Sequence, residues 1–264
     1  MMKRLIPFCL VLTGFPLNAE KKESKTDFSE KELKDLVALI DERQRNTGDY
    51  EANVIIKETE DNIDKAFEAS VFRRDEDEKW MILFTRPKSE AGKGYLRIDK
   101  NIFMYEPALG KWERKTERAS IVGTGSQRSD FDGSKLTEEF DSSYIAKEKL
   151  GRFLVHHIRL VAKANVEVGY PIQELWIDIE TKNILKRQDK TKAIPEKLMR
   201  TTLYPKWNKV FSKLKKADVY VPERILIYDE VEKANKTEVF IKNVSFVSLP
   251  PNMFTKAWIE SKSK

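Results

Sequence analysis

Histidine and carboxylate side chains are the groups of this sequence that could carry acid-base or metal chemistry. The two histidines of the chain, His156 and His157, are adjacent. Neighbouring residues of a strand point to opposite faces of its sheet, so these imidazoles cannot share a metal ion without distortion. Asp130 and Asp132 open a segment Asp-Phe-Asp-Gly-Ser that looks superficially like a calcium loop. Its alternating oxygen ligands and terminal bidentate glutamate are missing, so we expect strand-filling histidines and no metal site.

Sequence motifs for nucleophilic or phosphate chemistry are also missing. The chain has no Gly-x-Ser-x-Gly elbow, no His-Glu-x-x-His motif and no Walker A loop. The short Gly92-Lys-Gly94 and Gly123-Thr-Gly125 segments lack the following helix that a phosphate cradle needs. We therefore predict that the protein is not an enzyme, has no catalytic residue and uses no cofactor. A lipid hydrolase is the weakest of the alternatives.

The N-terminal residues have the order of a secretory signal. Lys3 and Arg4 precede an apolar run over 5–17, and Ala19 ends the small-residue stretch before a charged segment. The run is too short to cross a membrane as a helix, which takes roughly 20 residues. We predict a signal peptide over 1–19, a flexible segment over 20–27 and a single domain over 28–264, with an uncleaved anchor as the alternative. Cys9, the lone cysteine, would be removed with the signal peptide, leaving no thiol.

A helix is predicted to begin after Ser29. Ser29 and Glu32 form a capping box, because the hydroxyl can accept from the amide of Glu32 while the carboxylate reaches back to the amide of Ser29. The helix should end before Gly48. Four apolar residues recur at helical spacing and must lie against other elements, which predicts a lid: Leu33, Leu36, Val37 and Ile40.

Short apolar runs cut by charged, glycine or proline turns dominate the rest of the chain and predict an antiparallel meander. One or two helical turns are expected over 134–140. We predict a mainly β protein with few helices (α+β) and roughly eleven to thirteen strands. The expected strands are 50–57, 66–73, 80–85, 94–98, 102–105, 111–115, 143–150, 152–162, 172–178, 184–190, 198–209, 220–229 and 236–247.

Several predicted strands are apolar on both faces, so both faces must be buried. With few helices to cover them, a curved sheet around an apolar cavity explains the pattern better than a sandwich; an ordinary packed core is the alternative. The choice of inward face is a hypothesis, because a shift of one residue exchanges inward and outward side chains. The residues predicted to line the cavity are Trp80, Ile82, Phe84, Phe103, Tyr105, Phe153 and Trp176.

The formal net charge is +6, and basic residues are concentrated between Lys186 and Lys216. Such a segment can meet anionic lipid head groups or an acidic partner protein, and a solvated strand face is the simpler alternative. Export through the predicted signal peptide argues against nucleic acid as a partner.

The order of several segments resembles one protein family. These are Met81-Ile-Leu-Phe-Thr-Arg-Pro-Lys88, Gly92-Lys-Gly-Tyr-Leu-Arg-Ile-Asp99, Ser129-Asp-Phe-Asp-Gly-Ser134, Val221-Pro-Glu-Arg-Ile-Leu-Ile-Tyr-Asp229 and Leu249-Pro-Pro-Asn-Met-Phe-Thr255. Together they resemble the outer membrane lipoprotein-sorting proteins similar to LolA, in the spirochaete-type branch of uncharacterised LolA-like domains.

This resemblance implies an unclosed antiparallel β-barrel of about eleven strands, with a helical lid over an apolar cavity. It also implies a periplasmic carrier that binds lipoprotein or lipid acyl chains for transport to the outer membrane. Its partners would be an acylated lipoprotein or lipid, and a membrane-associated donor or acceptor protein or an anionic membrane surface that meets the Lys186 to Lys216 segment. The alternative is an envelope lipid sensor or regulatory subunit that acts through a protein partner.

Overall fold

The computed structural model describes residues 28–45, 48–99, 101–116, 119–127 and 130–263. The predicted signal peptide and flexible segment lie outside these residues. Within them the chain forms helices α1 (Glu30–Arg45), α2 (Leu136–Glu139) and α3 (Lys256–Lys262). None of these helices is long and apolar enough to cross a membrane.

Thirteen strands are present in the described part of the chain, and each predicted strand overlaps one of them. They are β1 (Asp49–Glu60), β2 (Ile63–Arg74), β3 (Lys79–Arg86), β4 (Gly94–Ile98), β5 (Asn101–Glu106), β6 (Lys111–Lys115), β7 (Phe140–Leu150), β8 (Phe153–Ala162), β9 (Ile172–Asp178), β10 (Ile184–Lys190), β11 (Leu198–Ser212), β12 (Ala217–Asp229) and β13 (Lys236–Ser245).

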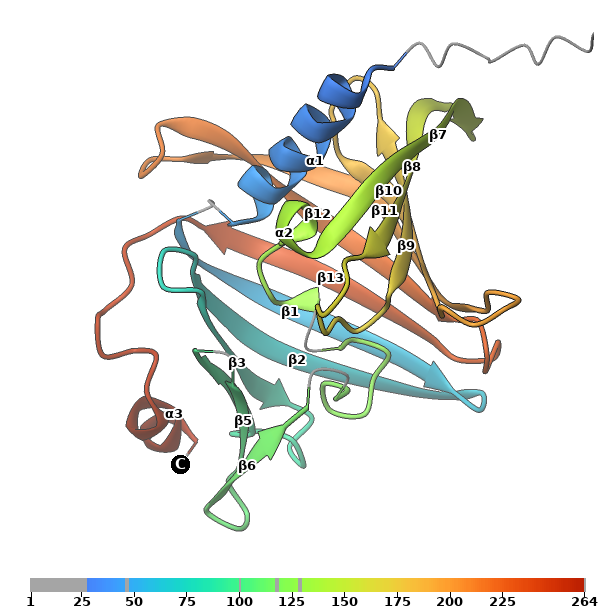
Figure 1. Cartoon of the computed structure of the whole chain (residues 1–264). Coiled ribbons are helices and arrows are strands. Elements are labelled where there is room, and N and C mark those ends of the chain that lie inside the picture. Colours follow the sequence, from blue (N-terminus) through green and yellow to red (C-terminus); the bar gives the residue numbers. More distant parts are fainter. Residues whose placement is uncertain (1–27, 46–47, 100, 117–118, 128–129, 264) are drawn as a thin grey trace, which may run out of the picture.

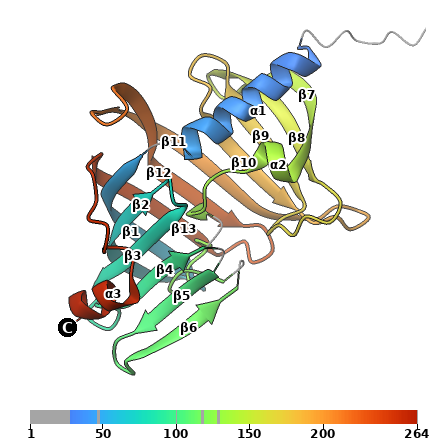
Figure 2. The same ribbon diagram turned by 60° about the vertical axis from the view of Figure 1, so that its left-hand side comes forward.

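All strands belong to one antiparallel sheet in the order β6-β5-β4-β3-β2-β1-β13-β12-β11-β10-β9-β8-β7. The first and last strands of the meander, β1 and β13, pair at the centre, while β6 and β7 lie at opposite edges. The sheet curves so that α1 and α2 lie over its concave side (Figures 1 and 2). The predicted unclosed barrel is confirmed, with 13 strands.

Helix α1 begins as its capping box requires. The amide of Glu32 donates to Ser29 Oγ over 3.2 Å, and the amide of Ser29 donates to Glu32 Oε2 over 2.7 Å. The four predicted lid residues are buried on one side of the helix. Figure 2 shows this helix lying across the strands of the β7–β10 part of the sheet.

The β3–β5 part of the sheet is buried on both faces because a third helix covers its convex side. Trp80 and Ile82 point to the concave side, whereas Met81 packs with Ile259 of α3 on the other. Helix α3 was not predicted, although its start has a recognisable signal: the hydroxyl of Thr255 accepts from the amide of Trp258 over 3.2 Å. Part of the two-sided apolar pattern is therefore explained by α3.

Candidate functional site

The concave face of the sheet holds a first apolar cluster on β1–β5, which we call the strand cluster. Its largest fully buried members include Trp80, Phe84, Ile56 and Ile82, each 1% exposed. Ile121, from the loop after β6, closes over them from the concave side. These side chains form a continuous apolar layer inside the curve of the sheet, and other parts of the chain cover it.

A second apolar cluster, which we call the lid cluster, lies between α1 and β7–β10. Leu36 and Val37 of the helix pack with Ile158 of β8 and with Leu175 and Ile177 of β9. Ile158 and Ile177 are fully buried. The amphipathic helix therefore covers the apolar concave face of these strands directly.

A buried ionic network separates the two apolar clusters. Arg187 Nη2 donates to Asp130 Oδ1 over 3.1 Å, and its Nε donates to Asp189 Oδ2 over 3.2 Å. Arg200 also donates to Asp130, and its Nε lies 3.8 Å from Asp189 Oδ2. Two carboxylates thus face two guanidinium groups, which balances the charge of this largely buried network.

The two acids of this network are held differently. Burial disfavours the charged form of Asp130, but Arg200 and Arg187 outweigh that effect and lower the pKa of its carboxyl. Burial dominates at Asp189, which is 0% exposed, and raises its pKa despite the same two arginines. As an anion, Asp130 therefore ties its loop to β10 and β11, the strands that carry Arg187 and Arg200.

That loop also reaches the strand cluster. Asp132 Oδ1 accepts from Trp80 Nε1 and from Arg97 Nη1, each over 2.9 Å. The ring of Phe131 lies 5.5 Å from that of Trp80. The Asp-Phe-Asp segment thus plugs the concave face, with its acids bound to arginine and tryptophan.

Polar contacts fasten α1 to the segment that follows this loop. The carboxylate of Asp41 accepts from the amides of Leu136 and Thr137 over 2.9 and 2.8 Å, and from both the Thr137 and Ser134 hydroxyls. Arg45 Nη1 lies 2.8 Å from Glu138 Oε1. We call this set of contacts the lid latch.

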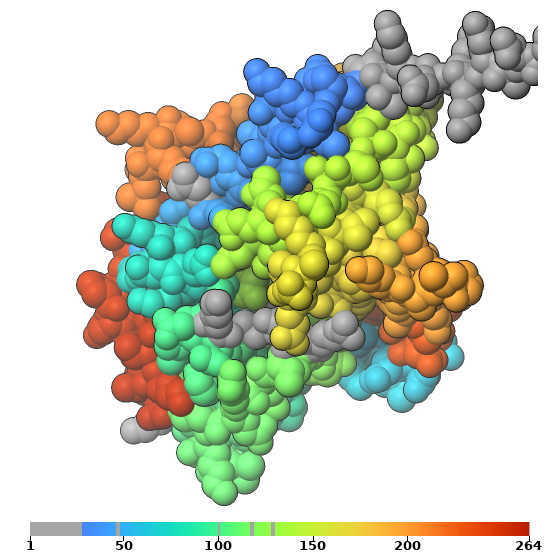
Figure 3. All heavy atoms as spheres, viewed as in Figure 1, coloured from blue at the N-terminus to red at the C-terminus, as the bar shows by residue number. Residues whose placement is uncertain are grey.

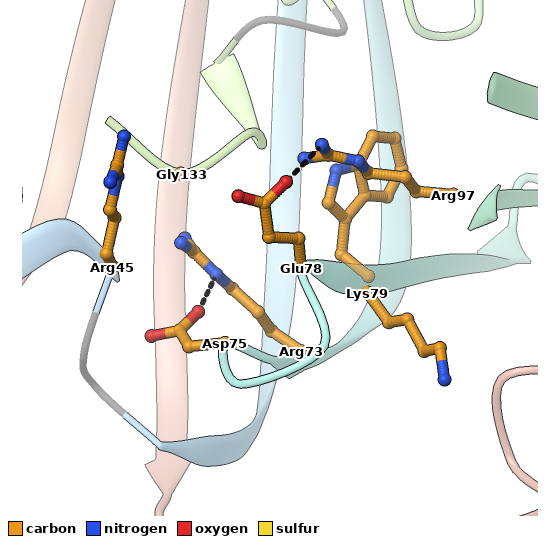
Figure 4. A pocket seen from close by; sticks show the side chains of 8 residues that line it. Arg45, Arg73, Asp75, Glu78, Lys79, Arg97 and Gly133 are labelled. Atoms are coloured by element: carbon orange, nitrogen blue, oxygen red, sulfur yellow. Dashed lines mark hydrogen bonds and ion pairs between the residues drawn. The ribbon is translucent and has the colours of Figure 1, made fainter. Parts of the chain in front are cut away.

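A small polar pocket of about 40 Å³ lies beside the lid latch. Figure 4 shows Arg45 on one side of it and two ion pairs, Arg73 with Asp75 and Arg97 with Glu78, on the other. The pocket has room for little more than water. It marks the joint at which the end of α1 meets the β2–β3 turn.

A larger pocket of about 210 Å³ lies at the opposite end of the concave face and is also polar. Glu58, Arg200 and Thr237 line it. Glu58 Oε2 accepts from the Thr237 hydroxyl and from the amide of Gly125 over 3.2 Å. Burial raises the pKa of this carboxyl. In this closed arrangement the apolar clusters are filled by the protein's own side chains.

Three of the predicted cavity residues come together. Trp80, Ile82 and Phe84 lie side by side in the strand cluster. Phe103 and Tyr105 point to the convex side. Phe103 pairs with Leu96 across the strands, and both Leu96 and Tyr105 pack in the apolar cluster that contains Ile259 of α3. The alternate residues of β5, Ile102 and Met104, face the concave side in their place.

The other two predicted cavity residues also lie away from the clusters. Trp176 is on the convex side of β9, stacked on His157 at 4.0 Å, with Lys186 Nζ 3.9 Å from its ring centre. Phe153, at the β7–β8 turn, is 36% exposed. The neighbours of Trp176 in β9, Leu175 and Ile177, face the lid instead.

The two histidines point to opposite faces, as strand alternation requires. His156 packs against the ring of Phe28 at 4.3 Å, beside the start of α1. His157 lies on the convex side between Glu148 and Glu174, with nitrogen to oxygen distances of 3.1 and 3.4 Å. Burial lowers the pKa of both imidazoles. Among the described residues, no group of three or more histidines, cysteines or acids is placed to hold a metal ion.

The basic segment between Lys186 and Lys216 does not form one continuous surface. It runs along β10 and β11, where Arg187 and Arg200 are drawn into the ionic network. Lys190 pairs with Glu174 over 2.7 Å on the convex side. Lys206 and Lys209 are exposed along β11 but pair with Glu223 and Asp218, and the other exposed lysines of the segment lie near the two ends of β11.

Comparison with known proteins supports the fold assignment. Residues 76–261 match the profile of a family described as "Uncharacterized protein". The chain belongs to this family. No curated protein matches the chain in sequence.

Three solved structures share the fold of this family member. A proposed outer membrane lipoprotein-sorting protein domain from Vibrio parahaemolyticus superposes with a TM-score of 0.75 at 16% identity, over 87% of this chain and 99% of that one. A DUF1329 family protein from Desulfovibrio piger gives 0.76 at 17% identity, over 87% and 98%. A LolA superfamily protein from Nitrosomonas europaea gives 0.70 at 16% identity, over 86% and 98%. The LolA-like fold predicted from the sequence is therefore confirmed.

Proposed function

We propose that this protein is a periplasmic carrier that binds the acyl chains of a lipid or lipoprotein on its concave face and transports them to the outer membrane. The observation that carries this proposal is the position of α1, whose apolar side is the cover of the lid cluster. An acyl chain could replace the helix there without exposing the strands to water. Each buried methylene contributes about 0.8 kcal/mol, so such a carrier needs apolar surface and no catalytic group.

The proposed site consists of the concave surface and its cover. Trp80, Ile82 and Phe84 supply the strand cluster, and Ile158 and Leu175 supply the floor beneath the helix. The proposed lid residues are Leu33, Leu36, Val37 and Ile40. Phe103, Tyr105, Phe153 and Trp176 are left out, because their side chains lie on the convex side or at an edge turn.

Entry of a ligand requires the lid latch to open. The latch joins α1 to α2 through polar contacts centred on Asp41, whereas the strands beneath are joined by continuous backbone ladders. Polar contacts between a helix and a loop segment break at lower cost than a sheet ladder, so the lid is the part of the fold that moves. The proposed carrier thus exchanges its cargo by displacement of α1.

The test is titration of the purified protein with a fluorescent polyene fatty acid. The expected result is saturable one-to-one binding that unlabelled phospholipid displaces. Asp41→Ala should accelerate association, because it weakens the latch without touching the apolar surface. Asp35→Ala, at an exposed position of the same helix, is the matched control. Absence of binding in the wild type and in the open-latch variant would refute the carrier function.

A further inference from the structure

The long hairpin of β11 and β12 reaches beyond the rest of the sheet. Strand β10 pairs with β11 only as far as Leu203, and β13 pairs with β12 only as far as Arg224. Beyond these positions β11 and β12 pair with each other, up to Ser212 opposite Ala217. Figures 1 and 3 show this arm, in orange, projecting at the upper left beside α1.

The tip of the arm carries an unusual combination of exposed residues. Phe211 is 60% exposed and Leu214 is 52% exposed. Lys213 and Lys216 beside them are also exposed, and Lys215 is half-buried. The nearest acid, Asp218, is paired with Lys209 at 2.7 Å. The turn itself is therefore purely basic and presents two large apolar side chains to solvent.

The root of the arm is firmly held, in contrast to its tip. Trp207 Nε1 donates to the carbonyl oxygen of Ile184 over 3.0 Å. Val219 and Val221 pack with Phe246 in an apolar cluster of their own. Exposure of the two apolar side chains at the tip is thus a feature of a fixed element.

We propose that the tip of this arm, residues 211–216, inserts into the head-group region of an anionic lipid membrane. Aromatic and leucine side chains flanked by lysines are the composition with which peripheral proteins enter the membrane interface. Each lysine near an anionic surface strengthens binding by about fivefold. A stable protein partner would need about 800 Å² of surface on this side, which two side chains at the end of a two-stranded hairpin do not supply.

The position of the tip gives this docking a direction. A methyl group placed on Gly48, just after α1, would lie 3.9 Å from Leu214 Cδ1. The guanidinium carbon of Arg43 in α1 lies 5.0 Å from the ring centre of Tyr220 in the arm. A docked tip therefore brings the C-terminal end of α1 to the membrane surface. The inference that the tip docks on a membrane depends only on the residues of the arm. The further idea that docking serves the exchange of lipid cargo rests on the proposed function.

The test is sedimentation of the protein with vesicles of phosphatidylcholine, with and without 30% phosphatidylglycerol (about one anionic lipid in three). The mass of each preparation is measured first, because a retained apolar run over 5–17 would bind vesicles by itself. One variant combines Phe211→Ser with Leu214→Ser, and its control is Leu109→Ser, at a turn residue that is 65% exposed.

A second variant reverses the charge of the tip at Lys213, Lys215 and Lys216 with glutamate. Its control makes the same net change of charge at exposed lysines elsewhere, Lys88, Lys147 and Lys149. We expect the wild type to bind only the anionic vesicles, the serine variant to bind about tenfold more weakly, and the charge-reversed tip about 100-fold more weakly. Both controls should bind like the wild type.

Three results would overturn the proposal. They are equal binding of the wild type to neutral and anionic vesicles, retention of binding by either tip variant, and no vesicle binding at all. The last result, together with loss of an envelope protein partner in the tip variants, would assign the arm to a protein partner instead. Fatty-acid titration of the same variants separates this outcome from the carrier function, because the tip lies outside the proposed acyl site.

Discussion

The carboxylate of Asp41 accepts hydrogen bonds from both the amide and the hydroxyl of Thr137, over 2.8 and 2.6 Å. The same carboxylate binds the amide of Leu136, so one side chain joins the lid helix α1 to α2. Asp41 is 5% exposed, which keeps these bonds away from water. A further contact holds the same helix to the β9–β10 turn, where Arg43 Nη1 donates to the carbonyl oxygen of Thr181 over 2.7 Å.

Asp41→Ala should open the lid while leaving the sheet folded. Loss of several hydrogen bonds to a buried carboxylate should lower the free energy of unfolding by about 3 kcal/mol. Amide hydrogen exchange should speed up in α1 and α2 and stay unchanged in β9 and β10. Unchanged exchange in α1 would show that the latch does not hold the lid, and Asp35→Ala controls for the loss of charge.

Asp130→Asn should destabilise the part of the sheet around β10 and β11. The substitution leaves Arg187 and Arg200 buried without their shared anion, which costs about 3–5 kcal/mol. Urea unfolding measures this loss. In the double variant Asp130→Asn with Arg200→Gln, the loss should fall short of the sum of the single losses by about 1 kcal/mol or more. Strict additivity would mean that the two groups are not coupled.

Glu58→Gln should stabilise the protein at neutral pH. Burial raises the pKa of the Glu58 carboxyl, so the folded state binds its proton more tightly than the unfolded state does. The wild type therefore loses stability as the pH rises from the ordinary pKa of a glutamate through the raised value. The variant lacks this loss because its amide does not titrate, and its oxygen can still accept from Thr237 and Gly125. Between pH 4 and 8 the melting temperature of the variant should rise increasingly above that of the wild type. A variant that is less stable than the wild type at pH 7 would contradict this.

Gly94→Ala should undock the C-terminal helix. A methyl group on Gly94 would lie 2.6 Å from Ile259 Cγ2, and Ile259 is fully buried. Relief of this overlap should cost about 1–3 kcal/mol. The environment of Trp258 would change, so near-ultraviolet circular dichroism reports the shift. Gly110→Ala is the control, because a methyl group there meets no other atom within 4 Å. Its positive φ angle strains alanine, so we compare the near-ultraviolet spectrum of this variant and not its stability.

The strands could be predicted from the sequence because their signals are local. Runs of apolar residues, with turn residues between them, gave β4, β6, β9 and β10 their observed bounds. The capping box at Ser29 likewise marked the start of α1. Such signals depend on a few neighbouring residues, so the sequence alone carries them.

The facing of the strands could not be predicted, because it depends on partners far along the chain. Trp80 and Phe103 look equally apolar, yet α3 covers the side on which Phe103 lies and draws Lys256 to 4.2 Å from its ring centre. Trp176 is turned outward by its neighbours His157 and Lys186. A strand with apolar residues at every position carries no signal for its register.

The ionic network was also hidden from the sequence. Asp130 lies 57 residues from Arg187 and 70 from Arg200, and only the sheet brings them together. The role of the Asp-Phe-Asp segment as a plug bound to Trp80 and Arg97 had no signal in the neighbouring sequence. The same applies to Asp41, which looks like any exposed helix residue until α2 is placed beside it.

The proposed function depends on the binding of acyl chains by the concave face. Native mass spectrometry of the protein purified gently from a bacterial envelope, followed by extraction and identification of bound lipid, tests it most directly. We expect a bound acylated species at one copy per protein. Its occupancy should change in Asp41→Ala and stay constant in Asp35→Ala. A protein that carries no lipid, and takes up none when phospholipid is added, would contradict the account and leave the apolar clusters as an ordinary packed core.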